Sequence, residues 1–236
     1  MLCIAHQAVR GGPHSPILAK DVQLLMTGKL ADMRKDYNGH PFDESSAHRD
    51  PLTQFRLWLD DVRQTSLIEA NAMVVATIDQ HGMPSARTVL LKEVDDRGLV
   101  FYTNYDSRKG REIADNPAVA LVFNWPTMER QVRVSGVASK VDASESDAYF
   151  ATRPPGSQVG AVASPQSEPV PNRAWLEARF ERFAANDGPI PRPHNWGGYR
   201  VEPVMFEFWQ GRPNRLHDRL RYDQTQAGWE LIRLAP

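Results

Sequence analysis

The chain has 236 residues, of which 41% are apolar and 24% charged, and its formal net charge is −1. This balance argues against a protein that binds nucleic acid by neutralising phosphates. The single cysteine, Cys3, excludes an internal disulfide framework and is typical of a reducing compartment. No apolar run approaches the ~20 residues that a membrane-spanning helix needs. We therefore expect a cytoplasmic protein with neither nucleic-acid nor membrane partners.

The N-terminal stretch MLCIAHQAVRGGPHSPILAK begins with a short apolar run that no signal-peptide cleavage site follows. We expect residues 1–28 to form a flexible tail. Residues 29–236 are expected to form a single domain, because no linker composition interrupts 45–236. Met26 opens the stretch MTGKLADMRKDY, and we hypothesise that the residues before it are an upstream extension of the reading frame.

The first predicted element of the domain is a helix that starts at Asp50 and Pro51. Asp can accept hydrogen bonds at an N-cap, and Pro suits the first helical position. Four apolar residues then recur at helical spacing and form one stripe: Phe55, Trp58, Leu59 and Val62.

The rest of the chain is rich in short strand patterns separated by turns. Strands are expected over 72–79, 84–94, 99–104, 118–125, 130–141, 199–210, 218–224 and 229–235. Sequential short strands favour an antiparallel sheet closed into a barrel. The expected fold class is therefore mainly β with flanking helices (α+β).

A first candidate site is the stretch SRKGREIADN. Ser107 is a candidate N-cap for a helix that ends near Asn116 and Pro117. Arg108 and Lys109 then lie in the first turn, where the helix dipole disfavours cations by roughly 0.3–1 kcal/mol. A bound phosphate would make the cations favourable at this position, because free N–H groups and the dipole both favour an anion there. Two solvated charges on a surface helix are an equally good interpretation.

A second candidate is Arg87, which lies among apolar residues in the strand-like stretch SARTVLLKE. A guanidinium in such a setting needs a partner, and a structural carboxylate is a commoner partner than a ligand. Strand alternation puts Arg87 and Lys92 on opposite faces. One ligand contacting both would have to wrap the strand edge or meet a bulge.

A third candidate is the stretch SESDAYFATRPPGSQ, where Ser144 and Asp147 resemble a capping box. Tyr149 and Arg153 are four residues apart and share a face of the predicted helix, and Ser157 follows in a loop. Their hydroxyl and guanidinium donors suit a phosphate. A Tyr–Arg stack on the surface is the alternative.

The fourth candidate is FWQGRPNRLHDR, in which Trp209 stands beside basic residues. In an extended segment Arg215, His217 and Arg219 alternate with other residues, and Arg215 and His217 share a face. This suits an anionic or electron-rich planar ligand, with His217 as a candidate acid or base near neutral pH. A barrel-closing strand with charges outside is the alternative.

Several site types are absent from the sequence. There is no Gly-rich dinucleotide or Walker loop, no Cys/His metal spacing and no G-x-S-x-G nucleophile elbow. We therefore expect no metal, and we expect a cofactor to supply the chemistry while the protein binds anions.

Long ordered segments from about Met33 to Pro236 resemble the pyridoxamine (pyridoxine) 5′-phosphate oxidase family. They include EANAMVVATIDQHGMPSARTVLLKEV, FYTNYDSRKGREIADNP, RQVRVSGVASKV, YFATRPPGSQVGAVASPQS, NWGGYRV, EFWQGRPNRLHDRLRY and the ending RLAP. The resemblance implies an FMN-binding split β-barrel and an obligate homodimer with FMN between the subunits. It implies oxidation of pyridoxine or pyridoxamine 5′-phosphate to pyridoxal 5′-phosphate, with dioxygen reoxidising the flavin and yielding hydrogen peroxide.

The resemblance also implies site residues. The implied FMN contacts are Arg87, Thr88, Val89, Leu90, Leu91, Lys92, Tyr102, Thr103, Arg108, Lys109, Gln131, Gln166, Ser167, Trp209 and Arg219. The implied substrate contacts are Arg34, Tyr37, Lys92, Tyr149, Arg153, Ser157, Arg215, Leu216 and His217. Of these, Arg215 and His217 are the implied catalytic residues, and the stretch MRKDY resembles the family's N-terminal lid.

Two alternatives remain at this point. Phenazine-pathway flavin oxidases share the fold and the EFW…RLH ending, but that branch loses the phosphate clamp that Lys92, Tyr149 and Arg153 provide. Because this chain keeps all three residues, its sequence favours the vitamin B6 enzyme. A non-catalytic protein that binds flavin or pyridoxal phosphate is the other alternative.

Overall fold

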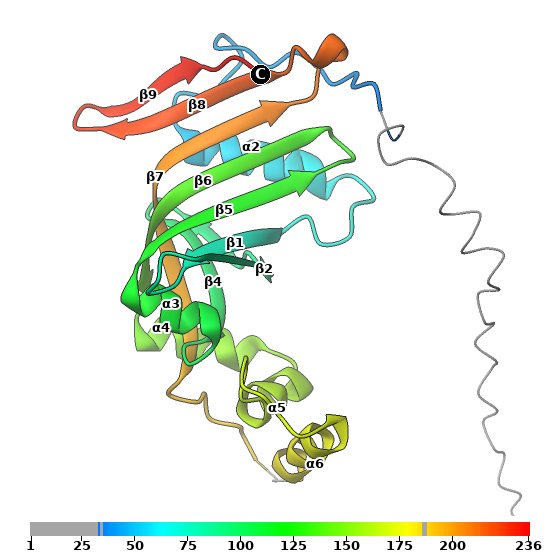
Figure 1. Cartoon of the computed structure of the whole chain (residues 1–236), viewed down its shortest axis with the longest axis vertical. Helices are drawn as coiled ribbons and strands as arrows, with labels where there is room; N and C mark the ends of the chain where they lie inside the picture. The colour runs from blue at the N-terminus through cyan, green and yellow to red at the C-terminus, as the bar shows by residue number, and fades with distance from the viewer. Residues whose placement is uncertain (1–32, 34, 186–187) are drawn as a thin grey trace, which may run out of the picture. The chain divides into compact units, whose positions relative to one another are not determined.

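The computed structural model describes residues 33, 35–185 and 188–236. Within these, Tyr37–Pro236 form one compact unit (Figure 1). The predicted tail over 1–28, the alternative start at Met26 and the predicted lid residue Arg34 all lie outside the described residues.

A nine-stranded antiparallel sheet organises this unit. Its strands are β1 (Ala72–Ile78), β2 (Pro84–Leu90), β3 (Glu93–Asp95), β4 (Gly98–Asn104), β5 (Ala118–Trp125), β6 (Arg130–Lys140), β7 (Trp196–Gln210), β8 (Asp218–Thr225) and β9 (Gly228–Arg233). The helices are α2 (Pro51–Arg63), α3 (Arg108–Asp115), α4 (Ala143–Thr152), α5 (Pro155–Ala163) and α6 (Arg173–Ala184), with a 3₁₀ turn η2 (Pro213–Arg215). The predicted mainly β, antiparallel class with flanking helices is confirmed.

Strand β7 pairs with three other strands of the sheet, whose order is β2-β1-β5-β6-β7-β4-β3. Along one edge β7 pairs with β6. Along the other edge, residues 196–201 pair with β4 and residues 205–210 pair with β8. Because it changes partner halfway, β7 links the β4 side of the molecule to the β8–β9 hairpin, as the orange strand in Figure 1 shows.

Helix α2 fills the concave side of the sheet. Its Asp50 N-cap accepts from the Thr53 N–H at 2.8 Å, and Pro51 begins the helix, as the sequence predicts. The predicted apolar stripe faces inward: Phe55 is fully buried, and its ring centroid lies 4.8 Å from that of Phe123 on β5. Burying this stripe against the strands explains why the sheet curls around α2.

The stretch 84–94 is not one strand, contrary to expectation. β2 ends at Leu90 and β3 starts at Glu93, because the backbone changes partners between them. The N–H of Leu91 donates to the Asn71 carbonyl, whereas that of Lys92 donates to the Val100 carbonyl on β4. The alternation that placed Arg87 and Lys92 on opposite faces therefore does not extend to Lys92.

The predicted capping box of Ser144 and Asp147 is wrong. α4 has Asp142 at its N-cap, with no side-chain capping bond. α4 also ends before Arg153, which is extended (φ −72°, ψ 144°) because Pro154 follows it and disfavours a helical conformation.

Helices α5 and α6 are absent from the sequence-based expectations. Ser157 lies in α5, which starts at Pro155, and not in a loop. α6 has a recognisable start signal, since Asn172 accepts from the Trp175 N–H at 2.9 Å. Its apolar residues are not gathered on one buried face, so periodicity alone does not reveal it.

Phe55→Ala should lower the free energy of unfolding by about 3–5 kcal/mol, because it leaves a cavity against β5. Leu57→Ala in the same helix is the matched control, since Leu57 is 52% exposed. The control should change stability by about 0.5 kcal/mol or less. Urea denaturation at one fixed protein concentration measures both, and equal losses would contradict this assignment of the core.

Candidate functional site

A cavity of about 960 Å³ opens between β2, β4, the start of α3 and the α4–α5 segment. Most of the predicted ligand contacts line it: Arg87, Thr88, Val89, Leu90, Lys92, Tyr102, Thr103, Arg108, Lys109, Tyr149, Arg153, Ser157, Gln166 and Ser167. Segments that are distant in the sequence thus meet in one place. Leu91 does not line it, because its side chain is buried in the core.

The position of β2 explains how one cavity reaches both faces of a strand. Among the described strands β2 pairs only with β1, so its second edge is open. Arg87 points to the core side and Thr88 to the opposite side, yet both line the cavity. The cavity therefore extends around the open edge of β2.

Lys109 is a buried cation at the base of this cavity, 7% exposed. Its Nζ donates to Thr103 Oγ1 at 2.8 Å, Gln166 Oε1 at 2.9 Å and Ser107 Oγ at 3.0 Å. All three acceptors are neutral, and within the described residues Lys109 makes no ion pair with a carboxylate. Burial, reinforced by the nearby charge of Arg87, lowers the pKa of Lys109 to about 8.

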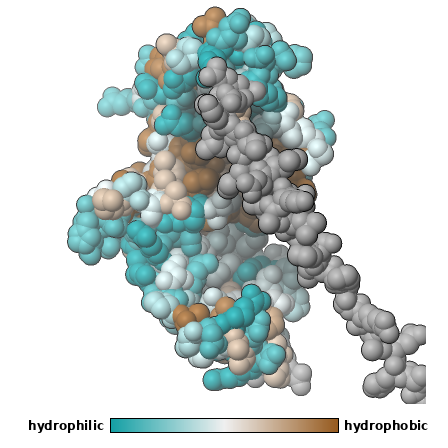
Figure 2. Space-filling model, turned by 45° about the vertical axis from the view of Figure 1, so that its right-hand side comes forward, coloured by the Kyte–Doolittle hydropathy of each residue, from teal (hydrophilic) through white to brown (hydrophobic). Residues whose placement is uncertain are grey.

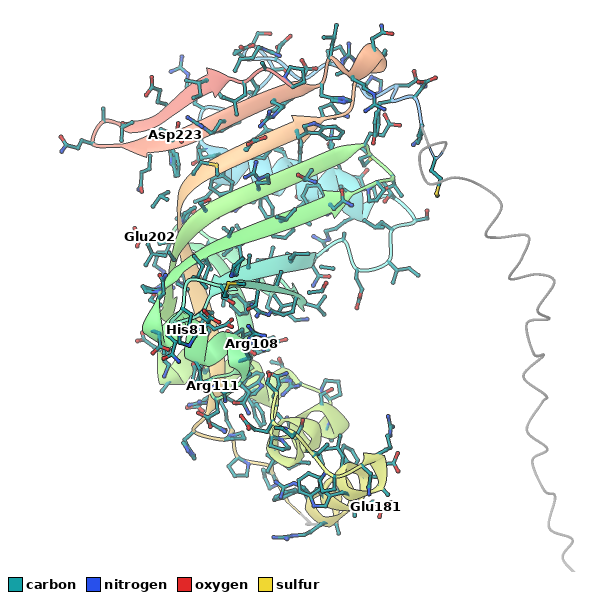
Figure 3. All side chains as sticks on the ribbon, viewed as in Figure 1. His81, Arg108, Arg111, Glu181, Glu202 and Asp223 are labelled. Carbon is teal, nitrogen blue, oxygen red and sulfur yellow. The ribbon has the colours of Figure 1, made fainter. Side chains whose placement is uncertain are left out.

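Ser107 caps α3 as predicted, accepting from the Gly110 N–H. Arg108 therefore begins the helix, as in Figure 3, and its Nε lies 2.7 Å from Glu112 Oε1. Arg87 Nη2 lies 3.2 Å from Glu112 Oε2, so the interpretation of Arg87 as paired with a structural carboxylate is confirmed. Three cations, Arg87, Arg108 and Lys109, surround this one carboxylate, which leaves the end of the cavity positively charged.

Glu112 was missed by the sequence reasoning, although its spacing of four residues from Arg108 is a signal for a helical ion pair. Its side chain is 5% exposed. Burial alone would raise the pKa of Glu112, but hydrogen bonds from Ser85, Thr77, Arg108 and Arg87 together lower it to about 2. The carboxylate is thus charged at neutral pH and holds both guanidinium groups at the cavity.

The other end of the cavity contains Arg153. Its guanidinium lies over the ring of Trp196, 4.6 Å from the centroid, and its Nη1 is buried with no hydrogen-bond partner among the described residues. Burial lowers the pKa of Arg153. Beside it, Tyr102 and Tyr149 stack with centroids 3.9 Å apart. An unpartnered buried donor is costly, and an anion entering here would satisfy it.

A second group of predicted residues lies elsewhere in the chain. Tyr37, Trp209 and His217 form an aromatic cluster with centroids 4.7 to 5.5 Å apart. Gln131 and Arg219 flank Trp209 in the strand register. We call this the C-terminal group, and its predicted members are Tyr37, Gln131, Trp209, Arg215, Leu216, His217 and Arg219. None of them lines the cavity of the same chain.

The expectation of an extended segment through Arg215, His217 and Arg219 is wrong. Pro213 starts the η2 turn, and Asn214 and Arg215 have left-handed backbone conformations (φ 56° and 61°). β8 begins only at Asp218, so Arg215 and His217 do not share a strand face. The strand alternation argument fails because the turn lies inside the motif.

His217 is held by the backbone of the same loop. Its Nδ1 accepts from the Arg212 N–H at 3.1 Å, so the neutral ring carries its proton on Nε2. Burial and the nearby charge of Arg215 lower the pKa of His217. His217 therefore presents a neutral donor at neutral pH.

Neither a metal nor a membrane site is evident in the part of the chain that the structure describes. It holds no group of His, Cys, Asp or Glu side chains arranged for a metal ion. None of its helices combines the length and apolar character needed to cross a bilayer.

Comparison with known families matches nearly all of this unit. A family model described as pyridoxamine 5′-phosphate oxidase matches residues 59–187. A second, described as the pyridoxine 5′-phosphate oxidase C-terminal dimerisation region, matches residues 196–236. The chain belongs to the pyridoxamine 5′-phosphate oxidase family. The resemblance inferred from the sequence motifs is thereby confirmed.

Curated relatives within this family are similar over almost their whole length. The pyridoxine/pyridoxamine 5′-phosphate oxidase of Thermosynechococcus vestitus is 56% identical over 209 residues, which are 88% of this chain and 99% of the relative. The protein of the same name from Ralstonia pickettii is 53% identical over the same shares of both chains.

Solved structures give the same fold. PhzG from Burkholderia lata 383, in complex with tetrahydrophenazine-1-carboxylic acid, has a TM-score of 0.81 and 30% identity, covering 86% of this chain and all of that one. A pyridoxamine 5′-phosphate oxidase-related, FMN binding protein from Nostoc punctiforme has a TM-score of 0.66 and 19% identity, covering 80% of this chain and all of that one. The split-barrel fold expected of the family is thus confirmed.

Glu112→Gln should remove a pH-dependent part of the stability. Because the folded-state pKa is about 2 against 4.5 for the free side chain, the charged carboxylate stabilises the fold above pH 4.5. This contribution, at most roughly 3 kcal/mol, is lost as pH falls from 4.5 toward 2. The stability difference between wild type and Glu112→Gln should therefore shrink over that range. Chemical denaturation measures it, and the exposed Glu177→Gln is the control that should show no such trend.

Proposed function

We propose that the chain is an FMN-dependent oxidase that converts pyridoxine or pyridoxamine 5′-phosphate to pyridoxal 5′-phosphate, with dioxygen as the electron acceptor and hydrogen peroxide as a product. The observation that carries the proposal is one cavity lined by two groups of cations, one from β2 and α3 and the other from the α4–α5 segment. Arg87, Arg108 and Lys109 form the first group, and Arg153 with its unpartnered Nη1 is the cation of the second. Two phosphates, one from the cofactor and one from the substrate, match these two groups. The names of the curated relatives support this assignment.

The residues at the α3 end fit an FMN phosphate. Lys109 is buried with only neutral acceptors, and the cluster around Glu112 has excess positive charge. The open edge of β2 offers backbone groups along the length of the cavity, where Thr88 and Leu90 lie. When bound, FMN supplies a two-electron acceptor that dioxygen can reoxidise.

The residues at the α4–α5 end fit the substrate phosphate. Lys92, Tyr149, Arg153 and Ser157 all line the cavity and are donors that suit a phosphate. The ring of Trp196 supports the Arg153 guanidinium from one side, and Arg153 is part of the cavity lining. Anchoring both phosphates restricts the two ring systems to a reactive distance, which is the main catalytic contribution we assign to the cavity.

A homodimer explains why the C-terminal group lies outside the cavity of its own chain. This group lies largely in the segment matched by the dimerisation-region model. We infer that it faces the cavity of the partner, where Arg215 orients the substrate ring and neutral His217 donates a hydrogen bond through Nε2. Each cavity then draws residues from both subunits.

The outer face of the sheet supports this dimer. Val74 and Val137 are 37% and 47% exposed, on the side opposite the core. Ala120 and Val122 lie between them on the same face of β5. Figure 2 shows hydrophobic surface interrupting the hydrophilic exterior on the face it draws. Arg133 and Ser135 of β6 also lie on this face, opposite Val122 and Ala120, so the face is mixed. Exposed valines grouped in this way are typical of a surface that a second subunit covers.

A flavin oxidase acting on another aromatic substrate is the second candidate, and the similarity to PhzG favours it. Anaerobic addition of pyridoxine 5′-phosphate separates the two, because only the proposed enzyme should bleach its flavin rapidly. In air, the purified protein should convert pyridoxine 5′-phosphate to the aldehyde with equimolar peroxide. A yellow, FMN-loaded protein that forms neither product would refute the proposal.

Arg153→Ala should raise KM by roughly 10- to 100-fold with a smaller effect on kcat, because it removes a charge-assisted contact present in ground and transition states alike. Arg215→Leu should instead mainly lower kcat. Arg173→Ala, on the exposed surface of α6, is the control and should change neither constant. Steady-state kinetics with pyridoxine 5′-phosphate measure all three, and an unaltered KM in Arg153→Ala would contradict the substrate-phosphate assignment.

FMN affinity should fall as pH rises above about 8. The free protein loses the Lys109 proton near this pH, whereas a bound phosphate would hold the proton on the ammonium. Lys109→Met should weaken binding at neutral pH and flatten the pH dependence. Arg111→Met is the control, because Arg111 is exposed on the same helix (Figure 3). This variant should keep the pH dependence of FMN binding. Flavin fluorescence titrations over about pH 7 to 9 test this, and a wild-type affinity that is constant with pH would refute it.

A further inference from the structure

Asp218 lies between His217 and Arg219 and does not line the cavity. Its carboxylate is 17% exposed and has three partners. Oδ2 accepts from the Phe42 N–H at 3.1 Å and lies 3.4 Å from Arg212 Nε, and Oδ1 lies 2.8 Å from Arg233 Nη1. One side chain thus connects three segments: residues 37–44, the loop 211–217 and strand β9.

The three partners do not depend on Asp218 equally. Arg233 also makes a two-pronged ion pair with Glu44, at 2.9 and 2.8 Å, so it keeps a carboxylate without Asp218. The Phe42 ring is buried and packs on Trp58. Arg212, in contrast, has no other ion-pair partner among the described residues. Loss of Asp218 should therefore affect the loop 211–217 most.

Arg212 is also the residue that holds His217. Its backbone N–H donates to His217 Nδ1 at 3.1 Å, while its guanidinium donates to the Gly39 carbonyl as well as contacting Asp218. The side chain of Arg212 is therefore fixed at the junction of two segments, and its backbone N–H is aimed at the imidazole. The hydrogen bond from this peptide to Nδ1 sets the tautomer of His217, so we expect a loosened guanidinium to weaken that control.

Residues 37–44 and the loop 211–217 meet with no space between them. A Cβ at Gly211 would lie 2.6 Å from Tyr37 Cδ1, and a Cβ at Gly39 would overlap the Gln210 side chain. At this junction the Tyr37 ring packs edge-on against His217, with centroids 5.4 Å apart. Small displacements of the loop must therefore move Tyr37 and His217 relative to each other.

We propose that Asp218 is a positioning residue: by anchoring Arg212, it keeps His217 in the Nε2–H tautomer and seats Tyr37 against the imidazole. Only the kinetic consequence of this inference rests on the proposed function. The tautomer and the packing are properties of the protein without substrate.

Asp218→Asn tests the inference in the full-length protein, because it keeps the shape of the side chain and removes its charge. Imidazole ¹⁵N NMR, with the His217 signals assigned by comparison with His217→Gln, should show Nε2–H as the dominant neutral form in the wild type. In Asp218→Asn the two tautomers should mix. Arg212→Met should produce the same change by removing the anchored side chain, which keeps the test decisive if Asp218→Asn does not fold.

Asp223→Asn is the matched control. It makes the same substitution on the same strand and also removes an arginine partner, because Asp223 Oδ2 lies 2.9 Å from Arg221 Nη2. In Figure 3 it lies on β8 toward the hairpin turn. The imidazole ¹⁵N spectrum of Asp223→Asn should match that of the wild type. An unchanged His217 tautomer in Asp218→Asn and Arg212→Met would overturn the proposal.

A double-mutant cycle supplies the kinetic test. Asp218→Asn should lower kcat about tenfold in the wild-type background and less than about twofold when His217 is already Gln, because its effect passes through His217. Equal losses in both backgrounds would overturn the positioning role. A shifted tautomer in a protein that does not oxidise pyridoxine 5′-phosphate would uphold this inference while refuting the proposed function.

Discussion

The structure around the cavity depends on one buried carboxylate that is outnumbered by cations. Glu112 pairs with Arg87 and Arg108 and lies near Lys109, whose own hydrogen-bond partners are all neutral. A fully neutralised cluster would have no reason to attract an anion, and an uncompensated one would be too costly to bury. The intermediate charge allows the cations to stay in place and still favour a phosphate. Glu112 therefore orients the two guanidinium groups without cancelling their combined charge.

The sheet topology then determines what the rest of the chain can contribute. β2 is an end strand, so its second edge is open, and residues from both of its faces line the cavity. β7 pairs first with β4, which carries Tyr102 and Thr103, and then with β8, next to His217. The cavity and the C-terminal group are thus connected through one continuous strand, although they do not meet within one chain.

Two helix caps, which depend on neighbouring residues, were predictable from the sequence, whereas the capping box expected at Ser144 and Asp147 was not found. The caps at Asp50 and Ser107 were predicted because each is a contact between a side chain and a backbone N–H three residues away. The family motifs also contain many of the residues that line the cavity, although Leu91 and the C-terminal group lie outside it and Trp196 was not among the predicted contacts. Features that depend on tertiary contacts were not predictable. The carboxylate partner of Arg87 is distant in sequence, and the change of backbone partner at Leu91 depends on β4. The left-handed conformation of Arg215 overrides an alternation that its sequence alone would suggest.

In the proposed dimer, the separation of the cavity from the C-terminal group of the same chain has a genetic consequence. Each polypeptide would donate its cationic pocket to one reaction centre and its His217-bearing turn to the other. Two alleles that are each inactive, one defective in the pocket and one in the turn, would then form mixed oligomers with one intact centre. Such allele pairs would restore partial growth or activity together, whereas two pocket alleles would not.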